Sequence, residues 1–246
     1  MNDPERARIK AYFMAERGYW RPWTETMLEA CPGFVQQYAR YAGHPARSGP
    51  LTERMVELIY VALDTSSSHL FEAGLHTHMK RALEVGASRA DIFDVLHLVA
   101  VQGIARVGQA TDILGEFVDL DGMPAIDEKL RARIDRLGAA HALALRGVAR
   151  LDPGYAEVLL DFVEQGGPGT GLSPAERSLV QLALHACFTA FDPDAIRRIV
   201  PTALSQGLAP AELLQAIQLG AHLAVHGTAL GVNVYRQLAG AGSPAD

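Results

Sequence analysis

Apolar residues recur at intervals of three and four along nearly the whole chain. Ile59, Ala62 and Leu63 fall on one face of a helix, and the stretch 213–221 has the same period. Signals for strands, such as alternating β-branched residues, are scarce. The pattern therefore predicts an all-α protein.

Prolines and capping residues divide the first part of the chain into helices. Three short helices are predicted at Pro4–Arg17, Pro22–Ala30 and Pro32–Tyr41, because proline is well tolerated near the first helical position. A loop is expected over 43–50, where glycine and proline collect. A further helix is predicted over 52–64, with a threonine cap at its start.

Short motifs recur in the second half of the chain at residue numbers that are 121 higher. Pro32-Gly33-Phe34 recurs as Pro153-Gly154-Tyr155, and no gap is needed between this pair and the others. The spacing predicts a tandem duplication of one structural unit. The further pairs are Leu51-Thr52 and Leu172-Ser173, Ala62-Leu63 and Ala183-Leu184, Ala82-Leu83 and Ala203-Leu204, Gly86 and Gly207, and Ala90-Asp91 and Ala211-Glu212.

The duplication predicts two domains, 1–120 and a second, degenerate copy at 121–246, with a seam near 118–128. The copies differ at polar positions, since Asp64 corresponds to His185. His78 corresponds to an isoleucine, and the histidine at position 226 corresponds to an alanine. Two interpretations stay open: one active copy beside a decayed one, or one composite site to which both copies contribute.

Composition narrows the possible partners. Hydrophobic residues make up 49% and charged residues 20% of the 246 residues, which is typical of a compact globular protein. The net charge of −6 argues against nucleic acid as the main partner. An apolar signal core and a membrane-spanning run are both absent from the sequence, so no membrane partner is expected. Cys31 and Cys187 form no CxxC pair, and a cytoplasmic location with reduced thiols is expected.

Ionisable residues gather in the stretch 57–78, at the junction of two predicted helices. His78 is the best candidate for a general acid or base. Glu57 or Asp64 would orient its imidazole, and Asp64 could instead pair with His69. A second possibility is a metal held by Asp64 and a helical face that carries His69, Glu72 and His76, but a solvated polar face is the simpler interpretation and no metal is predicted.

Other residues are candidates for binding the substrate. Phe71 and Gly74 share a helical face with His78, and Gly74 would leave room for a ligand or a close helix. Trp20 and Trp23 form an aromatic cluster with a neighbouring tyrosine. Packing against the core is the simpler role for this cluster, and contact with the substrate is the alternative.

Further polar residues lie on apolar helices of the second half. His222 and His226 are spaced by four residues, as metal ligands on a helix can be, but no third ligand is near them in sequence. His226 is preferred as the functional member of this pair. His185 and Cys187 are interpreted as buried core residues.

The chain resembles the carboxymuconolactone decarboxylase and alkylhydroperoxidase D superfamily, in a tandem form, and the similarity covers nearly the whole sequence in order. The matching pieces of the first copy are Gly18-Tyr19-Trp20, Pro32-Gly33-Phe34, Gly49-Pro50-Leu51, Glu57-Leu58-Ile59-Tyr60, Ala62-Leu63-Asp64, His69-Leu70-Phe71, Gly74, the run from His78 to Leu83, Gly86-Ala87-Ser88 and the run from Asp91 to Leu96. The run from Val225 to Val232 resembles the family in the second copy.

The resemblance implies a helical fold whose two tandem repeats pack as a pseudo-dimer, and a homo-oligomer, here a trimer of tandem chains. The peroxidase branch of the family uses a CxxCxxxH helix. Its two cysteines would fall at Phe71 and Gly74, or at Asp192 and Ala195 in the second copy. The resemblance therefore favours the thiol-free decarboxylase branch, since thiolate attack needs a thiol.

In that branch a histidine and a glutamate manage protons, which implies roles for His78 and Glu57, with His226 completing the pocket. The predicted activity is cofactor-free acid/base chemistry on a small organic acid: decarboxylation, isomerisation or lactone opening. The alternatives are a peroxidase-like antioxidant protein and a non-catalytic binding or scaffold relative.

Overall fold

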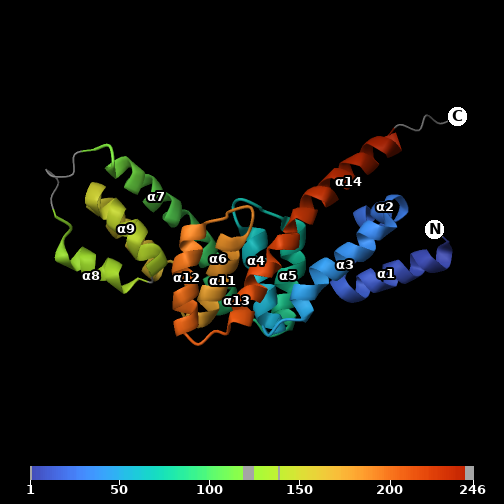
Figure 1. The fold of residues 1–246 in the computed structure, drawn as a ribbon, viewed down its shortest axis with the longest axis horizontal. Helices are drawn as coiled ribbons and strands as arrows, with labels where there is room; N and C mark the ends of the chain where they lie inside the picture. The colour runs from blue at the N-terminus through green and yellow to red at the C-terminus, as the bar shows by residue number, and fades with distance from the viewer. Residues whose placement is uncertain (1, 119–124, 138, 242–246) are drawn as a thin grey trace. The chain divides into compact units, whose positions relative to one another are not determined.

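Helices are the only regular secondary structure in the residues that the computed structural model describes, which are 2–118, 125–137 and 139–241 (Figure 1). The all-α prediction is confirmed for this part of the chain, and none of its helices is both long and apolar enough to cross a bilayer. The elements are α1 (Asp3–Arg17), α2 (Pro22–Ala30), α3 (Pro32–Arg47), α4 (Glu53–Thr65), α5 (Glu72–Glu84), α6 (Arg89–Ala100), η1 (Val101–Gly103), α7 (Ile104–Gly115), α8 (Glu128–Arg136), α9 (Ala139–Leu151), α10 (Pro153–Gln165), α11 (Pro174–Ala186), α12 (Pro193–Ser205), α13 (Pro210–Leu219), η2 (Ala221–Ala224) and α14 (Val225–Ala241).

The first compact unit is built from α1, α2 and α3 together with η2 and α14 from the other end of the chain. Its core packs Phe13 of α1, Trp23 of α2 and Tyr38 of α3 against Val225 and Ala229 of α14. The start of α14 is thus covered by helices that lie about two hundred residues earlier in the sequence.

Helix α3 is longer than the sequence pattern predicted. It continues to Arg47, so the prediction that it ends at Tyr41 and that a loop begins at residue 43 is wrong. A Cβ on Gly43 would overlap the side chain of Glu16, which shows how closely α3 approaches α1. Pro45 is buried within this helix, which continues through it although proline supplies no N–H to the helix.

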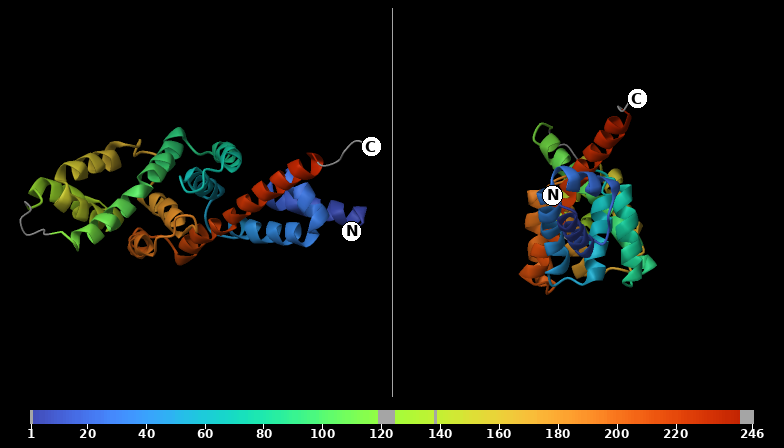
Figure 2. Two further views of the ribbon diagram at one scale, coloured as in Figure 1. Left: turned by 90° about the horizontal axis from the view of Figure 1, so that it is seen from above. Right: turned by 90° about the vertical axis from the view of Figure 1, so that its right-hand side faces the viewer.

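The second compact unit contains the helices from α4 to α13. Helix α4 contacts α5, α6, α11 and α13, so nearly every residue from Met55 to Asp64 is buried. Helices α7 to α10 form a further cluster in this unit, in which α7 and α9 lie side by side (Figures 1 and 2). Leu130, Ile134, Leu145 and Leu160 lie in its core.

Corresponding elements of the two halves make the same backbone hydrogen bonds. The N–H of Phe71 donates to the carbonyl of Asp64 over 2.9 Å, and the N–H of Asp192 donates to the carbonyl of His185 over 2.9 Å. These donors and acceptors are related by the predicted offset of 121 residues. The bonds close equivalent turns between α4 and α5 and between α11 and α12.

The helix that follows each of these turns ends in the same way. Gly86 after α5 has a φ of +93°, and Gly207 after α12 has a φ of +92°. Only glycine adopts this conformation without strain, which explains why both copies have a glycine there. The order α4–α5–α6–η1–α7 then recurs as α11–α12–α13–η2–α14.

The last helix of each half packs against the first helices of the other half. Helix α7 packs with α8, α9 and α10, and α14 packs with α1, α2 and α3. The compact units therefore do not coincide with the predicted domains 1–120 and 121–246, which describe repeats along the sequence. The boundary between the repeats stays a prediction, because residues 119–124 of the expected seam lie outside the described residues.

A buried carboxylate anchors the loop that precedes α11. Asp94 of α6 accepts hydrogen bonds from the N–H groups of Gly169, Gly171 and Leu172 over 2.7, 2.9 and 3.0 Å, and it pairs with Arg177 at 2.6 Å. Burial would raise the pKa of Asp94, but these donors together hold that pKa below its usual value. The carboxylate thereby fixes the entry into α11.

A close contact fixes the turn between α4 and α5. A Cβ on Gly74 would overlap the carboxylate of Asp64 and would lie 2.6 Å from Cδ1 of Phe71. Since Gly74 is the third residue of α5, the buried carboxylate lies against the first turn of that helix, where the helix dipole favours negative charge. The space that the sequence assigned to a ligand or a close helix is therefore filled by Asp64.

We expect Gly74→Ala to lower the free energy of unfolding by about 1–3 kcal/mol, because the added methyl group displaces Asp64 or Phe71. The loss should occur even though alanine raises helix propensity by roughly 1 kcal/mol. Urea unfolding followed by far-UV circular dichroism measures the change. Gly227→Ala is the control, since nothing lies within 4 Å of a Cβ there. Equal stability of the two variants would contradict the contact.

We expect Asp94→Asn to lower the free energy of unfolding at pH 7 by about 2–4 kcal/mol, because buried N–H groups and Arg177 lose an anionic acceptor. The folded pKa lies below the unfolded value of about 3.9, so the carboxylate stabilises the fold fully above that value and the stabilisation is lost as pH falls through the folded pKa. Urea unfolding between pH 3 and 7 should show a flatter acid limb in the variant. The exposed Asp161→Asn serves as control and should change little.

Candidate active site

Helices α4 and α5 carry most of the residues that the sequence singled out. The side chain of Thr52 caps α4 by accepting from the N–H of Met55 over 3.3 Å, as the sequence predicted. Glu57 lies in the second turn of α4 and is half-buried among apolar neighbours. His78 lies in the second turn of α5 and is also half-buried.

The structure brings Glu57 and His78 together. Nδ1 of His78 lies 2.7 Å from Oε2 of Glu57, and the two side chains are only 18% and 13% exposed. A carboxylate can only accept a hydrogen bond, so Nδ1 carries the proton that is donated to Glu57. Nε2 of His78 is then the nitrogen whose lone pair can take up a proton.

Tyr60 packs beside this pair, although the sequence analysis did not single it out. Its ring packs against the imidazole of His78, with ring centroids 4.4 Å apart and an angle of 34° between the planes. Tyr60 is 1% exposed and lies one helical turn after Glu57, so both side chains reach the same imidazole. The spacing of three residues between Glu57 and Tyr60 was the signal that could have identified it.

A second carboxylate–imidazole pair lies at the end of α4. Nε2 of His69 is 3.8 Å from Oδ1 of Asp64, and Asp64 is 1% exposed. Burial lowers the pKa of His69, which favours its neutral form. Asp64 was predicted to pair with either His69 or His78, and the structure places it beside His69.

The predicted metal-binding face does not form as a helical face. His69 lies in the turn before α5, whereas Glu72 and His76 lie within α5, so the three residues do not share one helix. Glu72 and His76 are both exposed, in agreement with the simpler interpretation of a solvated polar surface. The spacing failed as a guide because the helix begins three residues after His69.

Phe71 and Gly74 have structural roles at this junction. Phe71 is the residue before the first turn of α5, and its ring lies 6.1 Å from that of His69. Gly74 is buried against Asp64 and Phe71. Contact of Phe71 and Gly74 with a substrate stays a prediction. For Gly74, the close packing against Asp64 and Phe71 already explains why a glycine is present.

The two tryptophans and His226 belong to the first compact unit. Trp23 is 4% exposed and lies in the core of that unit. Nε1 of Trp20 donates to Oε2 of Glu25 over 2.7 Å. These contacts favour the packing role over contact with the substrate. His226 lies in the first turn of α14 and is half-buried, and its role in completing the site stays a prediction.

The second half of the chain lacks the equivalent of the Glu57–His78 pair. The position of Glu57 is taken by Ser178, whose hydroxyl donates to Oε1 of Gln206 over 2.7 Å. The position of His78 is taken by Ile199, which is 3% exposed. The acid/base pair is thus a feature of the first half.

The second half does keep a buried carboxylate between its two helices. It comes from Asp192, just before α12, whereas in the first half it comes from Asp64, at the end of α4. Asp192 accepts from the N–H groups of Asp194 and Ala195. Its Oδ2 lies 3.9 Å from Nδ1 of His185 and 3.6 Å from Nη1 of Arg106. Burial, the largest effect, lowers the pKa of His185, so this imidazole is held in its neutral form. The interpretation of His185 as a buried residue agrees with its exposure of 9%.

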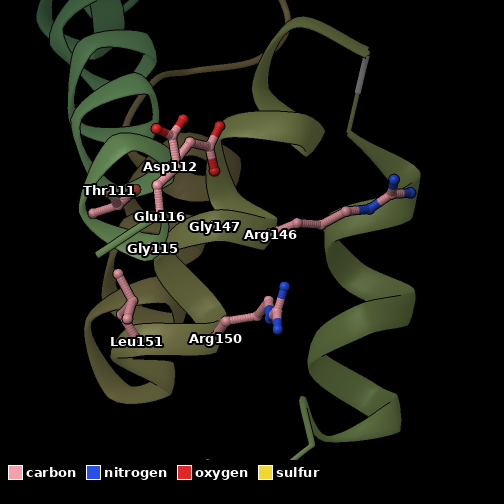
Figure 3. A pocket seen from close by; sticks show the side chains of 8 residues that line it. All are labelled: Thr111, Asp112, Gly115, Glu116, Arg146, Gly147, Arg150 and Leu151. Carbon is pink, nitrogen blue, oxygen red and sulfur yellow. The ribbon is translucent and has the colours of Figure 1, made fainter. Parts of the chain in front are cut away.

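A cavity of about 340 Å³ lies between α7 and α9, away from the predicted residues in sequence (Figure 3). Asp112 and Glu116 of α7 reach one end of it, and burial raises the pKa of Asp112. Arg146 points away in Figure 3, and its guanidinium pairs with Asp135 of α8 at 2.7 Å. None of the predicted site residues lines this cavity.

Comparisons with known proteins agree with this fold. The sequence model described as "Carboxymuconolactone decarboxylase family" matches residues 32–115, which include Glu57, Tyr60, Asp64, His69 and His78. No curated protein matches the sequence. A crystal structure from Burkholderia xenovorans LB400, named as a "putative gamma-carboxymuconolactone decarboxylase subunit", superimposes with a TM-score of 0.87.

That structure is 25% identical in sequence, and the match covers 98% of this chain and 100% of the other. The family match falls on the first half, where the Glu57–His78 pair lies, and the structural match extends over both halves. The CxxC positions of the peroxidase branch carry Phe71 and Gly74 in this chain. Residues 32–115 therefore match the carboxymuconolactone decarboxylase family, and the whole chain has the fold of a crystal structure named for that activity, in a form without the CxxC motif.

Proposed function

We propose that the protein is an enzyme that performs cofactor-free acid/base chemistry on a small organic acid, as a decarboxylase-like member of its superfamily. The observation that carries this proposal is the hydrogen bond between Glu57 and His78. Two features make the pair suited to catalysis. Both side chains are shielded from water by more than four-fifths, and the Tyr60 ring holds the imidazole on one face.

The geometry assigns a role to each member of the pair. Glu57 accepts the proton on Nδ1 of His78, which fixes the orientation of the ring and stabilises the imidazolium that forms when Nε2 takes up a proton. Nε2 can then remove a proton next to a carbonyl group or return one to a carbanion. Loss of carbon dioxide, isomerisation and lactone opening all need such a proton transfer.

The name of the similar crystal structure supports one substrate class. That protein is named for gamma-carboxymuconolactone, a lactone that carries carboxylate groups. We therefore propose a lactone acid as the first substrate to test. Assembly as a trimer of tandem chains and a cytoplasmic location accompany this proposal as predictions.

A thiol peroxidase is the less favoured alternative. Cys187 is buried at the end of α11, and Cys31 is exposed between α2 and α3. Neither lies in a CxxC motif, and neither is on α5, where the peroxidase branch has its cysteines. A non-catalytic relative is the other alternative. The shielded Glu57–His78 pair argues against it, because apolar residues at these positions would stabilise the fold about as well as the pair does.

We expect His78→Ala to lower the rate of decarboxylation of gamma-carboxymuconolactone by about 10²–10⁴-fold, because the group that transfers the proton is removed. Glu57→Gln should lower it less and should shift the pH profile, since the amide cannot stabilise the imidazolium. Ultraviolet absorbance of the lactone and release of carbon dioxide measure the rate.

His76→Ala is the matched control, because His76 lies two residues away on the same helix and is exposed. It should retain the wild-type rate. Full activity of His78→Ala would show that this histidine does not transfer the proton, and a wild-type protein without activity would exclude this lactone as the substrate.

We expect wild-type protein to consume hydrogen peroxide with dithiothreitol no faster than the double variant Cys31→Ser/Cys187→Ser does. The physical reason is that neither thiol has a partner cysteine in the motif that forms the catalytic disulfide. Peroxide loss is measured with a colorimetric assay. A robust rate in the wild type that disappears in the double variant would instead favour the peroxidase alternative.

A further inference from the structure

The first compact unit contains an apolar cavity that takes no part in the proposed acid/base chemistry. Its volume is about 430 Å³, which is within the range of small-molecule sites. One wall comes from α3, and the other comes from η2 and the start of α14. The cavity is lined by Phe34, Gln37, Tyr38, Tyr41, Ala221, His222, Ala224, Val225 and Thr228.

Aromatic rings form the α3 wall of this cavity. Phe34 and Tyr38 stack with their ring centroids 6.0 Å apart and only 15° between their planes. The ring of Tyr38 also meets that of Trp23, at 6.3 Å, in the core of the unit. Because Tyr38 is 7% exposed and packed from behind, this wall is rigid and presents a flat face. A planar ring is the ligand shape that such a face fits best.

His222 supplies a polar group at the opposite wall. It is 3% exposed, and its Nε2 lies 3.3 Å from Nη2 of Arg17. A guanidinium can only donate, so Nε2 is the acceptor and the proton of the neutral ring is on Nδ1. Arg17 also donates to the carbonyl of Ala42 over 3.1 Å.

The other lining side chains of the cavity are uncharged at neutral pH. Gln37 and Thr228 offer an amide and a hydroxyl, and none of the lining residues is a lysine, arginine, aspartate or glutamate. A charged ligand would therefore lose its hydration without an opposite charge in the lining to replace it. An apolar ring with one group that both donates and accepts a hydrogen bond matches this lining.

We propose that this cavity binds an uncharged aromatic molecule that carries a hydroxyl group, such as a phenol. The site is built from residues other than Glu57 and His78 and does not depend on the activity proposed for them. The ring would stack on Phe34 and Tyr38, and the hydroxyl group would bond to the amide, hydroxyl or imidazole groups of the lining. For a ligand of about ten non-hydrogen atoms, binding in the sub-millimolar range is expected.

The test is calorimetric titration of the full chain with 2-naphthol, and separately with 2-naphthoate, at pH 7. The two probes share a ring system, but only the second is charged. We expect saturable binding of 2-naphthol and at least tenfold weaker binding of 2-naphthoate. Equal or tighter binding of the carboxylate, or no saturable binding of 2-naphthol, would overturn the proposal.

Two variants locate the bound probe. Ala224→Phe places a ring in the cavity and should weaken 2-naphthol binding at least tenfold, whereas Ala239→Phe, at an exposed position near the end of α14, should leave it unchanged. Tyr41→Ala removes part of the wall at a residue that is 55% exposed, so the fold should persist and binding should weaken severalfold. Unchanged binding by both cavity variants would overturn the proposal.

His78→Ala separates this site from the proposed active site. Binding of 2-naphthol should be unchanged in that variant even if its activity is lost. A loss of binding in His78→Ala would place the probe at the acid/base pair and would contradict the cavity site. Far-UV circular dichroism of each variant confirms that the helices are intact before titration.

Discussion

The second compact unit depends on how the chain enters α5 and α12, the helices that follow its central helices α4 and α11. The first N–H groups of a helix have no acceptor within that helix, and in both halves a buried carboxylate lies against the helix start. In the first half it comes from Asp64, at the end of α4, and Gly74 makes room for it. In the second half it comes from Asp192, the residue before α12, which accepts from the N–H of Ala195, the counterpart of Gly74.

This exchange explains why the two halves carry different polar residues on the same fold. A buried carboxylate lies against the helix start in both halves, while the residue at the corresponding position differs, as Phe71 and His185 do. The Glu57–His78 pair is not tied to this requirement. Its loss from the second half, where Ser178 and Ile199 replace it, leaves the helices and their turns in place.

The two candidate sites differ in the kind of chemistry they can support. Glu57 and His78 form a hydrogen-bonded acid/base pair in a shielded position, which suits proton transfer. The cavity beside Tyr38 and His222 offers aromatic surface and neutral hydrogen-bonding groups, which suits binding without reaction. Both rest on residues held from behind by the core, Tyr60 in one case and Tyr38 in the other.

The sequence by itself determined the helical class, the offset between the halves and most helix starts, because these follow from local periodicity, proline and capping residues. It also pointed to His78 and Glu57. It did not predict the extension of α3 through Pro45 or the role of Tyr60 beside His78, and it left open whether Asp64 pairs with His69 or His78. Those features depend on packing between helices that are distant in sequence. Only the tertiary structure decided which carboxylate meets which imidazole, because spacing along one helix does not fix contacts between two.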